Sequence, residues 1–201
     1  MTDDRDAPRA PVSVEAFIAR ARAGDAAAFD EIVRRYESLV LRIARRMTGN
    51  REDALDVSQE SFLRIYRSLG RFGEGRRFES WVYRIVVNAS MDLLKKRGGL
   101  RLVPLDLAPG GGPEPEAAPA TGPERAVFLG EVRERLDALL GELPPRLRAT
   151  FVLRDVEGLE TAEIARILNC REVTVRRHSM EARERVRTLL NKRFPGLAPN
   201  R

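Results

Sequence analysis

The sequence predicts an all-α protein made of two small helical domains joined by a flexible, Pro/Gly-rich linker. Charged residues make up 33% of the chain and aromatic residues only 6%, a balance that favours amphipathic helices over a sheet-rich sandwich. Apolar residues on both sides of the linker recur at the steps of three and four that helices require. Residues 98–124 hold six of the twelve prolines and six of the fifteen glycines, and no helix or central strand survives that density.

The segment before the linker, residues 13–97, predicts a compact helical bundle. A short helix is expected at about 14–23, followed by one of about six turns that ends at Gly49-Asn50. One face of this long helix carries Phe29, Ile32, Val33, Tyr36, Val40, Ile43, Ala44 and Met47. Two further helices are expected, one from about residue 52 and one over about 79–97, with the glycine-broken loop GRFGEGRRF between them.

The segment after the linker, residues 125–195, predicts helices at about 123–140, 144–156, 161–168 and 172–191. Proline at Pro144-Pro145 suits the first turn of the second of these helices. The last two are separated only by residues 169–171, which is the spacing of a helix-turn-helix. Residues 1–12 are expected to be disordered, and residues 196–201 form a tail.

The net charge of +6 is unevenly distributed. Residues 13–97 carry +5 and residues 125–195 carry +4, whereas the linker between them carries −3. Two basic domains attract the phosphate backbone of a nucleic acid, whereas an acidic linker between them is repelled by it. This charge pattern permits nucleic-acid binding but does not prove it.

Several classes of function are disfavoured. No stretch resembles a signal peptide or a membrane span, so we expect a cytoplasmic protein without membrane insertion. Cys170 and His178 are the only residues of their kinds, which leaves no intrachain disulfide, no Cys/His metal cluster and no partner base for a reactive thiol. We therefore interpret Cys170 as a small buried residue in a turn. No catalytic or cofactor-binding constellation is present.

The helix at 172–191 is a candidate DNA-reading helix. Its apolar residues Val175, Ala182, Val186 and Leu189 lie close to one face. Side chains projecting elsewhere include Arg176, Arg177, Met180 and Arg183. Residues 171–193 hold eight basic and three acidic residues, whereas an ordinary solvated helix mixes Glu and Lys at four-residue spacing. The excess, the short preceding helix and the three-residue turn favour DNA binding.

Two candidate surfaces lie in the first bundle. The run DALDVSQESFLRIY places an acidic, amide-bearing surface on the first turns of a helix, and this surface suits a basic protein partner. The alternative is that these acids only complement the helix dipole. The run RFGEGRRFESWVYRIVVNASMDLLKKR combines aromatics, arginines and an amide, which are the groups that hold an extruded single-stranded base. Taken singly, Phe72, Phe78 and Trp81 are better explained as core residues.

Four stretches together resemble regions two and four of the extracytoplasmic-function group of bacterial RNA polymerase sigma factors. They are GDAAAFDEIVRRYESLV, GNREDALDVSQESFLRIYRSL, FESWVYRIVVNASMD and LPPRLRATFVLRDVEGLETAEIARIL. The resemblance implies that the first domain binds the clamp helices of the polymerase largest subunit and melts the −10 element, and that the second reads the −35 element. It also implies contact with the polymerase β-flap, a linker that threads the enzyme's channel, and an anti-sigma factor as a partner.

The resemblance also assigns candidate residues by position. Polymerase-binding candidates are Asp53, Asp56, Gln59, Glu60 and Leu63. Candidates for −10 recognition and strand capture are Phe72, Arg76, Arg77, Phe78, Arg84, Asn88 and Lys95. Candidates for −35 recognition are Arg171, Thr174, Arg176, Arg177, Met180 and Arg183.

The recognition helix departs from the family pattern at Val173, His178, Ser179 and Glu181. A glutamate replaces an arginine near phosphate, and a serine occupies the position of an apolar anchor. Glu160 also stands where relatives place the serine N-cap of the preceding helix, and Thr161 is a weaker substitute. A stand-alone helix-turn-helix regulator is the alternative function, although such a protein has no need of a strand-capturing loop.

Overall fold

The computed structural model describes residues 13–73, 75, 77–97 and 135–193. Within these ranges every regular element is helical, which confirms the predicted all-α fold class. The predicted linker at 98–124 and the terminal segments 1–12 and 196–201 lie outside the described residues. The helix expected at 123–140 is described only at its end, where residues 135–141 are helical.

The first group of helices follows the predicted bundle closely. Its elements are α1 (Val14–Arg22), α2 (Ala26–Thr48), α3 (Arg51–Ser68), the short 3-10 helix η1 (Leu69–Arg71) and α4 (Phe78–Lys96). The side chains of Ser13, Asp25 and Asn50 accept hydrogen bonds from the first turns of α1, α2 and α3, so each helix begins at a capping residue. Gly49 ends α2 in the left-handed conformation, with φ of 82°, as predicted.

The second group contains a feature that the apolar pattern did not predict. Its elements are α6 (Pro145–Phe151), the π-helical turn η2 (Val152–Val156), α7 (Thr161–Ile167) and α8 (Glu172–Arg193). The single helix expected at 144–156 therefore changes pitch halfway, and the Glu157 N–H donates to the Val152 carbonyl at 2.9 Å. The predicted turn at 169–171 is confirmed, with Asn169 at a φ of 49°.

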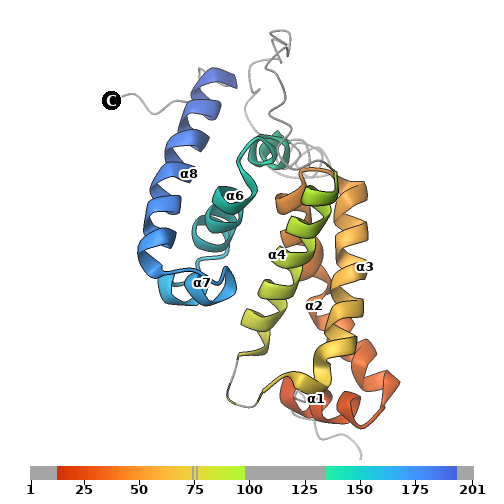
Figure 1. Ribbon diagram of the computed structural model, residues 1–201. Coiled ribbons are helices and arrows are strands. Elements are labelled where there is room, and N and C mark those ends of the chain that lie inside the picture. Colours follow the sequence, from red (N-terminus) through yellow and green to blue (C-terminus); the bar gives the residue numbers. More distant parts are fainter. Residues whose placement is uncertain (1–12, 74, 76, 98–134, 194–201) are drawn as a thin grey trace, which may run out of the picture.

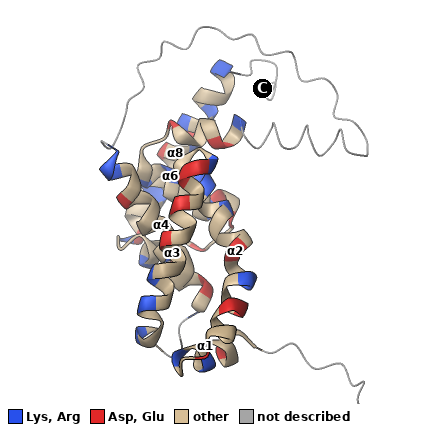
Figure 2. Cartoon of the chain, turned by 90° about the vertical axis from the view of Figure 1, so that its right-hand side faces the viewer, with Lys and Arg blue, Asp and Glu red and all other residues tan. Residues whose placement is uncertain are grey.

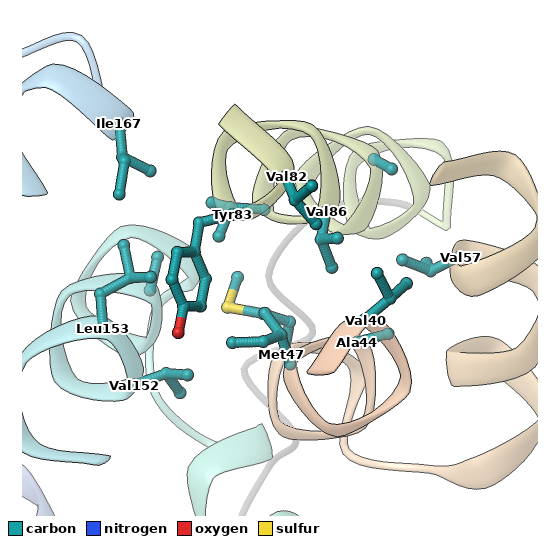
Figure 3. Close-up of a cluster of buried hydrophobic side chains, with 14 of the residues drawn as sticks. Val40, Ala44, Met47, Val57, Val82, Tyr83, Val86, Val152, Leu153 and Ile167 are labelled. Atoms are coloured by element: carbon teal, nitrogen blue, oxygen red, sulfur yellow. The ribbon is translucent and has the colours of Figure 1, made fainter. Parts of the chain in front are cut away.

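The two groups pack against each other around α4. Figure 1 shows α4 between α6 on one side and α2 and α3 on the other. Their buried apolar side chains form one continuous cluster. In Figure 3, Val152, Leu153 and Ile167 from the second group lie beside Met47 and Tyr83 from the first. The contact between the groups is therefore part of the hydrophobic core.

None of the helices in the described part of the chain combines the length and hydropathy needed to cross a membrane.

Candidate nucleic-acid interface

The predicted acidic surface on α3 is exposed over part of its length. Asp56 and Gln59 are exposed, and Leu63 keeps 48% of its surface open to solvent. Glu60 is half-buried and accepts from Arg64 at 2.7 Å, which in turn donates to Asp92 at 2.8 Å. Figure 2 shows acidic residues along the first half of α3. These side chains present carboxylate, amide and apolar groups together to a partner.

Asp53 differs from its neighbours because its side chain is buried, with 3% exposure for the residue. Its carboxylate accepts from Asn50 at 2.8 Å and from Arg97 at 2.7 Å, while its own N–H donates to the Asn50 side chain at 2.9 Å. This reciprocal pair resembles a capping box. In this structure Asp53 fixes the start of α3 and its link to the end of α4, rather than facing outward.

Two exposed apolar residues on α3 were not among the predicted site residues. Leu55 is 44% exposed and Tyr66 is 61% exposed, on the same helix as Gln59 and Leu63. Spacings of four and eight along a helix place Leu55, Gln59 and Leu63 on one stripe. Two leucines eight residues apart on a stripe outside the core-facing one were the signal that could have identified Leu55.

A cluster of aromatic rings lies where the chain passes from η1 to α4. Phe72 packs edge-on against Phe78 with ring centroids 5.2 Å apart, and both contact Trp81. Arg22 lies over the Phe72 ring at 5.9 Å and donates to the carbonyls of Leu69 and Phe72. Phe78 is buried, whereas Phe72 and Trp81 are half-buried. Among the predicted strand-capture residues, Phe72 is therefore the aromatic residue whose ring is partly exposed to solvent. Its contacts with Phe78, Trp81 and Arg22 hold it in place.

The polar residues predicted for strand capture lie along one side of α4. Arg84, Asn88 and Lys95 are exposed and follow one another at spacings of four and seven residues, which places them on one stripe of the helix. Arg77 is exposed just before the helix, and Arg76 lies outside the described residues. The described residues thus place an aromatic cluster at the start of α4 and an amide and cations along its outer stripe, and these are the kinds of group that bind an unpaired base and its phosphates.

The helix-turn-helix of α7 and α8 positions the predicted DNA-reading side chains. Val175, Ser179 and Ala182 are buried against α6 and α7, so the arginines of the opposite face point outward. Arg171, Arg176 and Arg177 are exposed and Thr174 is half-buried. Met180 is 74% exposed. This face can offer guanidinium groups to guanine and an apolar group to a thymine methyl.

Local ion pairs and burial modify this face. Arg176 pairs with Glu172 at 3.2 Å, and Arg183 pairs with Asp155 at 2.6 Å. Glu181, which departs from the family pattern, pairs with Arg185 at 2.9 Å. These ion pairs hold the side chains of Arg176, Arg183 and Glu181 against the protein. Each pair has to break before its side chain can contact DNA.

Two other departures from the family pattern, His178 and Ser179, are half-buried and buried, whereas Val173 and Glu160 are exposed. Burial, assisted by the nearby Arg177, lowers the pKa of His178, so its ring stays neutral at physiological pH. Ser179 is buried, and its hydroxyl has no hydrogen-bond partner among the described residues. Glu160 occupies the N-cap of α7 without a side-chain hydrogen bond, and Thr161 accepts from Arg154 at 2.6 Å.

Comparison with known proteins decides the family. The model for sigma-70 region 2 matches residues 32–99, and the model for sigma-70 region 4 matches residues 133–186. The sigma-H factor of Pseudomonas aeruginosa is 33% identical over 85% of this chain and 90% of its own length. The SigW factor of Bacillus subtilis, of the extracytoplasmic-function type, is 31% identical over 86% of this chain and 94% of its own length. The chain belongs to the extracytoplasmic-function sigma factors.

Further relatives agree with this assignment. The extracytoplasmic-function factor SigE of Mycolicibacterium smegmatis is 36% identical over 84% of this chain, which spans 65% of that longer protein. The solved structure of CnrH in complex with the cytosolic domain of CnrY superposes with a TM-score of 0.63 at 25% identity, covering 88% of this chain and 96% of that one. The sigma factor RpoE of Bartonella quintana shares the fold, with a TM-score of 0.58 at 18% identity over 81% of this chain and 96% of that one.

The sigma factor assignment confirms the predicted function as a promoter-recognising factor of RNA polymerase. Region 2 covers most of α2 together with α3 and α4, and region 4 includes α6, α7 and the first two-thirds of α8. The presence of region 2 does not favour the alternative of a stand-alone helix-turn-helix regulator. Sigma factors are initiation factors rather than enzymes. The described residues contain no group of three acidic, His or Cys side chains that could hold a metal ion.

Proposed function

We propose that this sigma factor divides promoter recognition between its two groups of helices. Residues 13–97 bind the polymerase core and melt the −10 element, and residues 125–195 read the −35 element. Residues 98–124 connect the two through the enzyme's channel. The observation that carries this proposal is the orientation of α8, whose buried face is fixed on α6 and α7 while its arginine face is exposed. A helix held in this way is ready to enter a major groove.

The proposed polymerase contact is the exposed part of α3. Asp56, Gln59 and Leu63 face the clamp helices of the largest subunit, with Glu60 at the edge of the contact. Asp53 supports this surface from beneath, because its carboxylate is held by Asn50 and Arg97. The region 4 group contacts the β-flap. The protein acts in the cytoplasm and contributes no catalytic residue of its own.

The proposed −10 contact uses the aromatic wall and the outer stripe of α4. Phe72 stacks on the extruded non-template base, Asn88 reads its edge, and Arg84 and Lys95 bind phosphates. Arg76 and Arg77 extend the cationic surface at the loop, while Phe78 supports Phe72 from the core. The −35 contact uses Arg171, Thr174, Arg176, Arg177, Met180 and Arg183.

An anti-sigma factor is a further proposed partner. CnrH, whose fold this chain shares, was solved in complex with the cytosolic domain of CnrY.

The polymerase assignment is tested by the double variant Asp56→Arg/Gln59→Arg. Reversing the charge of an exposed surface that meets a basic coiled coil should abolish copurification with core polymerase and leave helicity unchanged. Glu37→Arg provides a matched control, because Glu37 is an exposed acid on α2 outside the proposed contact. Core affinity equal to that of the wild type in the double variant would reject the clamp assignment.

Promoters for these assays come from selection. Wild-type holoenzyme is incubated with a library randomised at the −35 and −10 positions, and run-off transcription identifies the accepted sequences. Failure to enrich any sequence, with core binding intact, would reject the proposed function as a whole.

A further inference from the structure

Arg22, the last residue of α1, reaches the segment that leads from α3 into α4. α1 packs against η1, beside the start of this segment (Figure 1). The Arg22 Nε donates to the Leu69 carbonyl at 3.0 Å, and Nη2 donates to the Phe72 carbonyl. The Arg22 Cζ also lies 5.9 Å from the centroid of the Phe72 ring. One guanidinium therefore holds both ends of residues 69–72 and contacts the ring that is proposed to stack on a base.

The two carbonyls lie at the end of a short helix, where acceptors lack partners from the helix itself. The Leu69 carbonyl accepts from the Phe72 N–H at 3.1 Å as well as from Arg22. Carbonyls at the C-terminal end of a helix attract cations and need donors from elsewhere. A guanidinium suits this place, because its N–H donors lie in one plane and in fixed directions. Arg22 thus caps η1 from another helix.

The backbone around Phe72 needs such a tether. Three glycines lie within three residues of Phe72, namely Gly70, Gly73 and Gly75. Glycine has more backbone conformations to lose on ordering than any other residue. The Phe72 ring packs on Phe78 and Trp81, and Arg22 adds bonds to the backbone itself. These bonds fix the direction in which the chain leaves η1.

We propose that Arg22 is a positioning residue for strand capture, which holds the Phe72 segment ready before an unpaired base arrives. The inference rests on the function proposed for Phe72 and adds a residue from a helix outside that contact. A segment that is ordered in advance loses less conformational entropy when it binds. Affinity falls in proportion to the fraction of molecules in which the segment is ordered. Arg22 therefore supports promoter melting through Phe72.

Trp81 reports on the order of this segment. It is the only tryptophan of the chain, and its ring centroid lies 5.1 Å from that of Phe72. In Arg22→Gln the Trp81 ring should lose protection, seen as a higher acrylamide quenching constant at unchanged helicity. Arg20→Gln is the matched control, because Arg20 lies on the same helix and donates to Asp25 instead. Wild-type quenching in Arg22→Gln would overturn the proposal.

Strand binding gives the second measurement. Holoenzyme assembled with each variant binds a fluorescein-labelled single strand that carries the −10 sequence of a selected promoter. Arg22→Gln should lower the affinity about tenfold, and Arg20→Gln should not. Strands that lack one base at each position in turn identify the base that Phe72 holds, because Phe72→Ala loses nothing further on that strand.

The strand without that base separates positioning from a general defect. Arg22→Gln and wild type should bind this strand equally, because the captured base is absent. An equal loss on both strands would overturn the proposal. If Phe72→Ala weakens binding but Arg22→Gln does not, the positioning role alone is rejected. If no strand responds to Phe72→Ala, the proposed role of Phe72 is rejected, and that of Arg22 with it.

Salt dependence separates positioning from a direct phosphate contact, since Arg22 is exposed. Loss of one phosphate contact lowers the slope of log affinity against log salt by about 0.7 for a single strand. Arg84→Gln, at a residue proposed to bind phosphate, should show this change. Arg22→Gln should alter the slope no more than Arg20→Gln does. A slope reduced as in Arg84→Gln would show that Arg22 binds phosphate and would overturn the proposal.

Discussion

Arg148 shows how a single buried cation links the two groups of helices. It is 4% exposed and donates to the carbonyls of Met47, Gly141 and Leu143. Burial lowers its pKa to about 10, so the guanidinium remains charged at neutral pH. The sequence gives no sign of this role, because an arginine in a helical run normally points to solvent.

Ser179 is a residue at which stability is expected to rise on substitution. Its hydroxyl is buried and has no partner among the described residues, so Ser179→Ala removes a desolvated polar group. We expect the free energy of unfolding to increase by about 1 kcal/mol in urea denaturation. Ser61→Ala is the control: that buried hydroxyl donates to the Val57 carbonyl at 2.6 Å, so its removal should stabilise less or destabilise.

Arginines on α8 are expected to differ in what they contribute to DNA binding. Replacing Arg176 or Arg177 with Ala should change which −35 sequences are selected, since each good guanine pair discriminates by about 1–3 kcal/mol. Arg183→Ala should weaken all sequences alike and reduce the salt dependence by about one phosphate. Selection at two salt concentrations distinguishes these results. Three variants with wild-type preference and affinity would show that α8 does not read DNA.

At the scale of elements, helical periodicity predicted the helices well and their pitch poorly. The start of α3 and the end of α2 were predictable because Gly49-Asn50 combines a left-handed stop with a capping side chain. The π-helical turn η2 could not be predicted. The spacing of apolar residues does not show whether a backbone N–H donates to the carbonyl four or five residues before it. The burial of Asp53 could have been inferred from its position three residues after Asn50.

The end of α2 is expected to tolerate no side chain without cost. Gly49→Ala forces a Cβ into the left-handed region and against the backbone of Asp137 and Gly141, so we expect a loss of about 1–2 kcal/mol in unfolding free energy. Gly70→Ala is the matched control, because its added Cβ meets no atom within 4 Å and its φ is not positive. Equal stability of the two variants, measured in urea, would contradict the expected strain.

At the scale of the molecule, the sequence predicted two groups of helices but not the contact between them. Glu157 and Glu163 are ordinary acids in the sequence, and their partners Arg42, Arg46 and Ser80 lie more than 80 residues upstream. Pairing across such a distance leaves no local pattern. The candidate site residues could be placed by motif, but the packing of the second group beside α4 depends on this contact.

Acid pH should weaken the contact between the two groups of helices through Glu157. Burial alone would raise the pKa of this carboxyl, but hydrogen bonds and charge from Arg42, with Arg46 and Tyr83, hold it below its ordinary value of 4.5. A depressed pKa contributes stability that is present above the unfolded value and is lost as pH falls through the folded one.

The pH dependence can be isolated by comparing wild type with Glu157→Gln. The difference in their unfolding free energies should be constant from pH 8 to about pH 5 and should shrink as pH falls below about 4.5. Urea denaturation at each pH measures it. A difference that grew with acidity would contradict the assigned pairing.

The π-helical turn makes the position of Glu157 sensitive to a single deletion. Because η2 holds one residue more than an α-helical turn, deleting one codon within 152–156 would restore regular pitch. Glu157 would then take the place of Val156, about 100° around the helix, at a position where the residue is 37% exposed. A single-codon deletion would thus carry the carboxylate away from α2 without altering any residue proposed to touch DNA. One mutational step could therefore remove the ion pairs that join the two groups of helices.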